Sequence, residues 1–141
     1  LEIVDLLNSY SHNIDHGLVD EYAALFTEDA VFEIHFPGAP ITSFSGSEQI
    51  KSLAQGAKER REGGTQRRHL LTNIIFHEQT DTSATVACYL LLTSTTGSDL
   101  SFVFSGQYDG WLVKDEAGWK IRKWVLTSDS GMTAPASSEE S

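Results

Sequence analysis

In the second half of the chain, four strand-like apolar segments follow one another with only short turns between them. They are predicted as strands at 69–77, 84–95, 101–114 and 119–127. The turns are rich in Asp, Thr, Gly and Ser, residues that favour tight reversals of the chain. Strands joined by short turns pair as antiparallel neighbours, so this half predicts an antiparallel sheet and not a doubly wound parallel one.

The first half of the chain is mainly helical. Residues 1–16 place apolar side chains at helical spacing along one stripe, formed by Ile3, Leu6, Leu7, Tyr10 and Ile14. The other predicted elements are a short helix at 19–26, a strand at 30–36 and a helix at 47–60. This order predicts an α+β fold in which the helices cover one face of the sheet. Because the strands are long and apolar, we expect a second subunit to cover the other face, in a dimer or a trimer.

Length and charge limit the classes of protein to which the chain can belong. A chain of 141 residues fits one domain, predicted at 1–130, and the small, polar tail at 131–141 is expected to be disordered. The net charge of −10 disfavours binding to nucleic acid. The longest apolar runs are too short to span a bilayer. Because the sequence opens on a helical pattern, we expect no signal peptide in it.

The residues that usually hold metals or cofactors give no sign of such a site. Cys88 is the only cysteine and lies in an apolar run, which predicts a small buried side chain in a reducing, cytoplasmic protein. Apart from His12 and His16, the histidines lack metal-binding spacing, and no glycine-rich phosphate loop is present. We therefore expect neither metal nor cofactor. The basic segment 58–68 is interpreted as a solvated helix end and loop.

His69 is the strongest candidate for a catalytic group. It begins a predicted strand in which His69, Leu71 and Asn73 share one face by the two-residue period. Histidine changes charge near neutral pH, so on an inward face it could act as a general base. A structural histidine with one hydrogen-bond partner remains an alternative, and so does a backbone-bonded role for Asn73.

Tyr10 and Asp15 on the first helix are further candidates. Tyr10 lies on the apolar stripe, so its ring is expected to be buried and its hydroxyl needs a partner. Asp15 follows five residues later, about 140° around an ideal helix, which places it at the flank of the stripe. Considered alone, Asp15 is interpreted as a solvated or capping carboxylate. In the strand at 30–36, one face is expected to point inward and carries Phe32, Ile34 and Phe36.

Several short stretches, in this order and spacing, resemble one known family. Tyr10 and Asp15 precede YAALFTEDAV at 22–31, GSEQI at 46–50, RHLLTN at 68–73, GQYD at 106–109 and GWKIR at 118–122. Together they resemble the SnoaL-like branch of the NTF2-like superfamily, which includes scytalone dehydratase and the bile-acid 7α-dehydratases. The resemblance covers roughly residues 1–127. It implies a cone in which a curved antiparallel sheet wraps the N-terminal helices around a deep apolar pocket.

The resemblance also implies roles for particular residues. Tyr10, Asp15 and His69 match the catalytic residues of the dehydratases, and Asp15 would then reach His69. Arg122 matches the arginine of the bile-acid enzymes, whereas the second pocket histidine of scytalone dehydratase has no counterpart at 84–95. The expected substrate-binding residues are Asn73, Phe32, Ile34, Phe36, Tyr108 and Arg122.

The predicted function is a cofactor-independent dehydratase or isomerase that acts on a small, largely apolar carbonyl compound or polycyclic alcohol. His69 would move a proton, Asp15 would orient the ring, and Tyr10 would donate to the developing enolate or the leaving hydroxyl. Two alternatives stay open. One is an epoxide hydrolase or a polyketide or terpenoid cyclase on the same fold. The other is a non-catalytic binding or interaction module, which predicts that His69 is not paired with Asp15.

Overall fold

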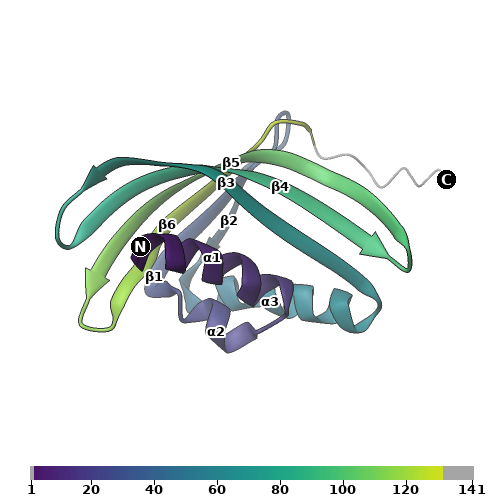
Figure 1. Ribbon diagram of the computed structural model, residues 1–141, viewed down its shortest axis with the longest axis horizontal. Helices are drawn as coiled ribbons and strands as arrows, with labels where there is room; N and C mark the ends of the chain where they lie inside the picture. The colour runs from purple at the N-terminus through teal and green to yellow at the C-terminus, as the bar shows by residue number, and fades with distance from the viewer. Residues whose placement is uncertain (1, 132–141) are drawn as a thin grey trace.

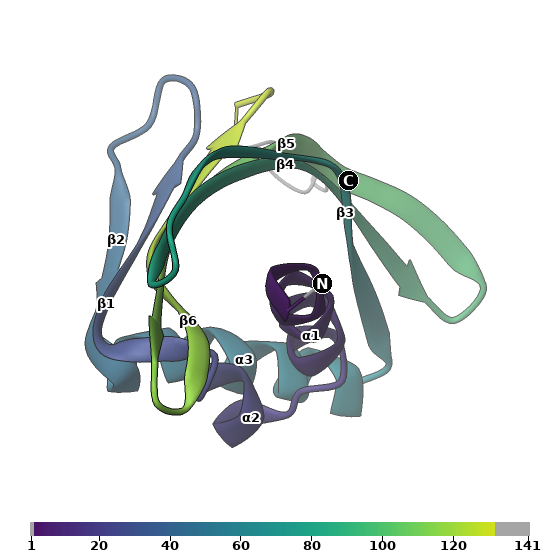
Figure 2. The ribbon, with the colours of Figure 1, turned by 60° about the vertical axis from the view of Figure 1, so that its left-hand side comes forward.

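A strongly curved sheet wraps around three helices in the computed structural model, which describes residues 2–131 (Figure 1). The helices are α1 (Glu2–Asp15), α2 (Val19–Ala23) and α3 (Gly46–Glu62). The strands are β1 (Phe26–His35), β2 (Thr42–Ser45), β3 (Thr65–Gln79), β4 (Ser83–Thr96), β5 (Asp99–Asp115) and β6 (Gly118–Ser128). All three helices lie on the concave side of the sheet (Figure 2). Of the predicted tail 131–141, all but Gly131 lies outside the described residues.

The six strands follow the order β2-β1-β6-β5-β4-β3. The predicted meander is confirmed, because β3, β4, β5 and β6 pair in sequence as antiparallel neighbours. The sheet is not purely antiparallel, however, since β1 runs parallel to β6. Local turn chemistry could not predict this pairing, because the two strands are separated by most of the chain. The short strand β2 was not predicted; it pairs antiparallel with β1 after the proline-containing loop.

The second helix is shorter than expected, and the strand after it begins earlier. We expected a helix at 19–26, but α2 ends at Ala23 and β1 begins at Phe26. The reason is tertiary: the Leu25 carbonyl accepts a hydrogen bond from the backbone N–H of Ile121 at 2.8 Å. Phe26 then pairs with Ile121 in β6. Sheet pairing with a distant strand therefore takes these residues out of the helix.

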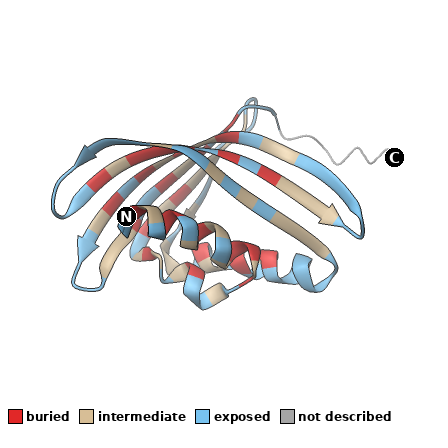
Figure 3. Ribbon diagram, viewed as in Figure 1, coloured by how far each residue is buried: buried red, intermediate tan, exposed pale blue. Residues whose placement is uncertain are grey.

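The apolar stripe of α1 lies against the concave face of the sheet, as its spacing predicts (Figure 3). Every residue of the stripe is buried: Ile3, Leu6, Leu7, Tyr10 and Ile14. Gly17 follows α1 with a φ of 66°, and a Cβ there would lie 2.8 Å from the Lys58 Cα. Only glycine allows α1 to end this close to α3. No helix among residues 2–131 is long and apolar enough to cross a membrane.

A bulge in β3 reverses which residues face inward. Asn73 has a φ of 56°, and the pairing of β3 with β4 shifts register between Thr72 and Ile75. The extra residue turns the alternation over, so Ile74 packs against the core while Ile75 is 56% exposed. The expectation that Asn73 shares the face of His69 is therefore wrong. Asn73 is exposed instead.

Candidate active site

The concave side of the sheet holds a cavity of about 220 Å³, lined in part by residues of α1 and α3. Tyr10 and His69 both line it. Of the six expected substrate-binding residues, four also line this cavity: Phe32, Ile34, Phe36 and Tyr108. The remaining lining is mostly apolar and includes Leu90, Leu92 and Phe104. The strand face expected to point inward at 30–36 is thus the face that the cavity uses.

Asp15 and His69 form the closest polar contact at the cavity. The Asp15 Oδ1 lies 2.7 Å from the His69 Nδ1, and both side chains are nearly buried, at 7% and 11% exposed. The backbone N–H of His69 also donates to Asp15 Oδ2, at 3.0 Å. Because a carboxylate can only accept, Nδ1 carries the proton and Nε2 of the neutral ring presents its lone pair. Among the described residues, no protein group bonds to Nε2.

Asp15 reaches His69 because α1 ends there. The helical wheel placed Asp15 at the flank of the stripe, and the carboxylate was interpreted as solvated when considered alone. As the last residue of α1, it is 8% exposed and points to the start of β3. A further hydrogen bond joins the two elements: Gln66 Nε2 in β3 donates to the backbone carbonyl of Asp15 at 2.8 Å. The contact that the family resemblance implied is therefore present in the structure.

A cluster of buried aromatic hydroxyls lies beside this pair. The Tyr10 and Tyr108 hydroxyl oxygens are 2.9 Å apart. The Tyr10 and His69 rings pack edge to face, with their centroids 6.2 Å apart. Burial raises the pKa of Tyr10 to about 12, so its hydroxyl keeps its proton at neutral pH and serves as a donor. The Tyr22 hydroxyl and the Trp124 indole N–H are also buried, without a protein hydrogen-bond partner.

Two arginines that we did not expect line the same cavity. Arg60 comes from the last turn of α3 and Arg67 from the start of β3. The Arg67 Nε is buried and makes no hydrogen bond, and neither guanidinium pairs with a carboxylate among residues 2–131. Burial, and secondarily the neighbouring Arg60, lowers the pKa of Arg67. The interpretation of 58–68 as wholly solvated is wrong for Arg67. The two-residue period of a strand, applied from His69 to the residue two positions before it, would have placed Arg67 on the inward face.

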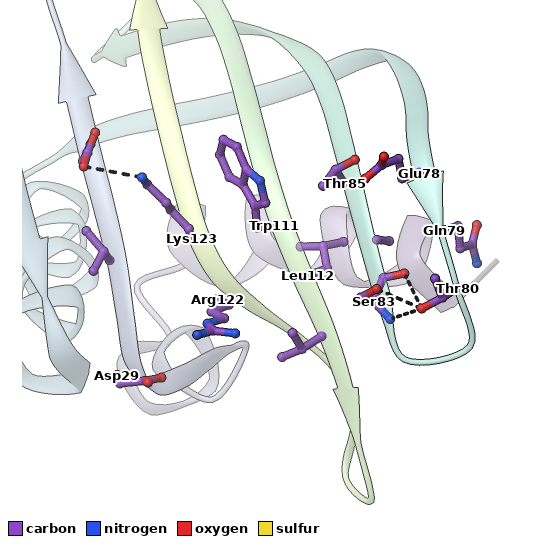
Figure 4. A pocket seen from close by; sticks show the side chains of 14 residues that line it. Asp29, Glu78, Gln79, Thr80, Ser83, Thr85, Trp111, Leu112, Arg122 and Lys123 are labelled. Atoms are coloured by element: carbon purple, nitrogen blue, oxygen red, sulfur yellow. Dashed lines mark hydrogen bonds and ion pairs between the residues drawn. The ribbon is translucent and has the colours of Figure 1, made fainter.

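A hollow of about 1150 Å³, larger than the inner cavity, lies on the convex face of the sheet (Figure 4). Its walls include Trp111, Arg122 and Lys123, together with the carboxylates of Asp29 and Glu78. It is wide and open, and none of its described lining residues places a buried polar group in it. The smaller inner cavity is therefore the better candidate for chemistry, because desolvated groups that face one another are what a reaction needs.

Arg122 does not fulfil the expectation drawn from the resemblance. It is exposed and lines the convex hollow, not the inner cavity (Figure 4). The pairing of β5 with β6 shifts register at this point: Trp111 pairs with Lys123, and Leu112 with Ile121. Arg122 is the unpaired residue between them, so simple alternation along β6 could not place it.

Other reactive groups contribute nothing to the cavity. Cys88 is buried, and this burial, with a smaller effect of Asp109, raises the pKa of its thiol to about 12, so it is not a nucleophile at neutral pH. His35 bonds to Glu33 at 3.0 Å, on the other face of β1 from the phenylalanines. Within residues 2–131, no three His, Cys, Asp or Glu side chains are grouped so that they could hold a metal ion.

Comparison with known proteins gives one family and many similar folds. A family model described as the SnoaL-like domain matches residues 1–125. No curated protein matches the chain closely enough to count as a relative. An NTF2-like protein with a cystatin-like fold from Novosphingobium aromaticivorans has a TM-score of 0.79 at 18% identity, over 96% of this chain and 83% of its own.

Two further solved structures are similar over most of their length. A protein from Catenulispora acidiphila, in complex with S-DNPA, has a TM-score of 0.73 at 26% identity, over 91% of both chains. ActVI-ORFA from Streptomyces coelicolor has a TM-score of 0.75 at 23% identity, over 91% of this chain and 95% of its own. These likenesses confirm the predicted NTF2-like α+β cone.

Proposed function

Because this chain belongs to the SnoaL-like family, we propose that it is an enzyme that moves a proton on a small, largely apolar carbonyl compound or alcohol, without a cofactor. The family often contains polyketide cyclases and dehydratases. The observation that carries the proposal is the 2.7 Å contact between Asp15 and His69 at the wall of an apolar cavity. A base, its orienting carboxylate and aromatic donors then meet around one space.

In this proposal, His69 is the general base. Its Nε2 removes a proton from the carbon next to a substrate carbonyl, and the ring becomes an imidazolium. Asp15 accepts the Nδ1 hydrogen bond, which orients the ring and stabilises the positive charge. The electron pair of the broken C–H bond moves onto the carbonyl oxygen and forms an enolate.

The tyrosines hold the developing oxygen charge. Tyr10 and Tyr108 share a hydrogen bond, so one hydroxyl proton is engaged between them and the other can point to the substrate. Burial raises the pKa of Tyr108 well above its ordinary value, and Tyr10 is shifted likewise, so both remain donors through neutral pH. Loss of a β-hydroxyl as water, with the proton from His69, gives a dehydratase. Return of that proton to another carbon gives an isomerase.

The size of the cavity favours a compact substrate. Its volume of about 220 Å³ is below the roughly 300–1,000 Å³ of common ligand sites. Aromatic side chains from β1 and β5 form much of the wall, notably Phe32, Phe36 and Phe104. A substrate with one or two rings fits this space better than a large polycycle does.

The proposal is tested by exchange of a carbon-bound proton, which requires no knowledge of the natural substrate. The protein is incubated with a panel of cyclic ketones and β-hydroxy ketones in D₂O, and deuterium uptake or loss of water is followed by NMR. We expect His69→Ala to lower the rate roughly 10²–10⁴-fold with the thermal transition preserved. His77→Ala, an exposed histidine on the same strand, is the matched control. Retention of most activity in His69→Ala would refute the assignment.

The alternatives receive less support. An epoxide hydrolase would need pocket carboxylates with Asn or Arg partners around a water molecule, but Asn73 and Arg122 both lie outside the inner cavity. A non-catalytic module was expected to leave His69 unpaired, which the contact with Asp15 opposes. Ring closure of a polyketide or terpenoid intermediate needs the same base and donors, so a cyclase remains a variant of the proposal.

We also propose that the subunits associate through the convex face of the sheet. This face carries exposed apolar side chains on adjoining strands: Leu70, Ile75, Tyr89, Leu91 and Trp111. Burying them would remove a broad apolar surface from water. Tyr89→Glu should then convert a dimer to monomers in light scattering, whereas a wild-type protein that is already monomeric contradicts the proposal. The cytoplasmic location stays a prediction.

A further inference from the structure

One end of the inner cavity carries two cationic side chains that pair with no carboxylate among the described residues. Arg60 and Arg67 line this end, and both also line the narrow gap of about 10 Å³ behind Asp15 and His69. Five of the ten basic residues of this acidic chain lie between positions 58 and 68. Arg60 is exposed to water, whereas Arg67 is half-buried, so it is the charge of Arg67 that is incompletely solvated and that an anion in the cavity would offset.

None of the nearby acidic groups supplies that counter-charge. Glu59 and Glu62 flank Arg60 on α3, yet no ion pair within 4 Å joins either arginine to a described carboxylate. Asp15 is already occupied by the ring and backbone N–H of His69. The buried Nε of Arg67 thus retains an unused donor, which natural proteins rarely leave without a partner.

Arg67 lies close to His69, the proposed base. Arg67 and His69 are alternate residues of β3, so their side chains leave the same face of the strand roughly 6–7 Å apart. Arg60 reaches the same cavity from α3, and its Nη1 lies 3.7 Å from where a Cβ at Gly56 would be, an ordinary van der Waals contact. The two arginines therefore converge from a helix and a strand on a point beside the base.

We propose that this end of the cavity binds an ionised carboxylate of the substrate, held by Arg67 and covered by Arg60. Planar guanidinium groups bind carboxylates through two parallel hydrogen bonds, and Arg is the residue best suited to this recognition. The inference rests on the proposed function for the reacting group, and it narrows the substrate class to keto acids or hydroxy acids with a compact apolar body. The carboxylate lies by the arginines, and the oxygen that becomes the enolate lies by Tyr10 and Tyr108.

Binding of unreactive probes tests the proposal without turnover. Benzoate and nitrobenzene have nearly the same shape, but only benzoate is charged, and each fits a one-ring cavity. Calorimetry or NMR titration of the wild-type protein at low ionic strength should show benzoate bound on the order of 10–100-fold more tightly than nitrobenzene. Equal affinities, or no benzoate binding at millimolar concentration, would overturn the proposal.

Variants assign the preference to the arginines. Arg67→Met keeps the length and apolar stem of the side chain, and it should abolish the preference for benzoate while nitrobenzene still binds. Arg67→Lys should retain part of the preference, because the charge remains but the bidentate geometry is lost. Arg68→Met is the matched control, since Arg68 is the exposed neighbour on the same strand and should leave both affinities unchanged. A preference that survives in Arg67→Met would refute the assignment.

Two further measurements separate this inference from others. Inorganic phosphate that competes with benzoate at equal affinity would identify a general anion site, and the carboxylate assignment would then be wrong. His69→Ala should bind benzoate with the preference intact, because the arginines do not depend on the base. Failure of the proton-exchange experiment with intact benzoate selectivity would refute the proposed reaction alone, whereas the reverse result would refute the carboxylate site alone.

Discussion

The two faces of the sheet differ in the burial of their polar groups, and the volumes of their hollows do not show this difference. The convex face holds the larger hollow, about 1150 Å³, whereas the concave face holds a cavity of about 220 Å³. On the convex face, charged side chains such as Arg122 and Lys123 remain near water. On the concave face, Asp15, His69 and Tyr10 are almost fully removed from it. A candidate site is recognised by buried polar groups that face one another, and the size of a hollow is a poor guide.

The largest expected difference between the faces is in catalysis. Asp15→Asn preserves the shape of the side chain but removes the charge that stabilises the imidazolium, so proton exchange should fall roughly 10²–10⁴-fold. On the convex face, Asp109 accepts hydrogen bonds from the Gln107 amide and has no other side-chain partner among residues 2–131, so Asp109→Asn should change the rate less than about threefold. Rates are compared by deuterium exchange into the same ketone. Equal losses in the two variants would remove the distinction between the faces.

Alkaline pH should destabilise the protein through the inner face. Burial raises the pKa of Tyr10 to about 12, whereas the ordinary value is 10.0, and the pKa values of Tyr22 and Tyr108 are raised in the same direction. The folded state therefore keeps protons that the unfolded chain releases above pH 10. Stability is full below pH 10 and is lost as the pH rises towards 12, by about 3 kcal/mol for Tyr10 alone.

Urea unfolding measured at pH 7 and near pH 11 checks this expectation. Tyr10→Phe should reduce the alkaline loss of stability, because the variant has no hydroxyl to ionise at that position. Tyr89→Phe, on the convex face, should leave the loss unchanged and serves as the control. A pH dependence that is identical in the two variants would contradict the assignment to the inner face.

Packing of the inner face should also be sensitive to a single methyl group. Gly110 on β5 lies against the Trp124 ring, and a Cβ there would be 2.6 Å from the ring atom Cζ3. Trp124 in turn stacks on Tyr108 with ring centroids 4.5 Å apart. Gly110→Ala should therefore destabilise the fold by about 1–3 kcal/mol, measured by urea unfolding. Gly56→Ala, in α3 and without a close contact, should be neutral or stabilising; destabilisation by both would indicate a general intolerance.

The smallest expected effect concerns Arg122. Because its guanidinium lines the convex hollow, Arg122→Ala should change the exchange rate less than about twofold and leave the preference for benzoate intact. A large loss of activity would show that the convex hollow participates in catalysis, either directly or through a second subunit, and the comparison between the faces would have to be revised.

Several features of the site could be predicted from local patterns. The stripe of α1 placed Tyr10 in the core, and the two-residue period placed His69 and the Phe32 face inward, because both patterns follow from backbone geometry. The same period failed at Asn73, and the resemblance failed at Arg122. Each lies at a β-bulge, and a bulge depends on how two strands pair, which alternation along one strand does not reveal.

The amino-acid sequence was sufficient for the buried stripe of α1, the antiparallel meander and the apolar inner wall, since these depend on spacing within short segments. The fold alone established the parallel pairing of β1 with β6, the contact of Asp15 with His69 and the entry of Arg60 and Arg67 into the cavity. Each of these joins residues from different elements. Such contacts depend on where one element ends and how another packs against it, and no local periodicity records that.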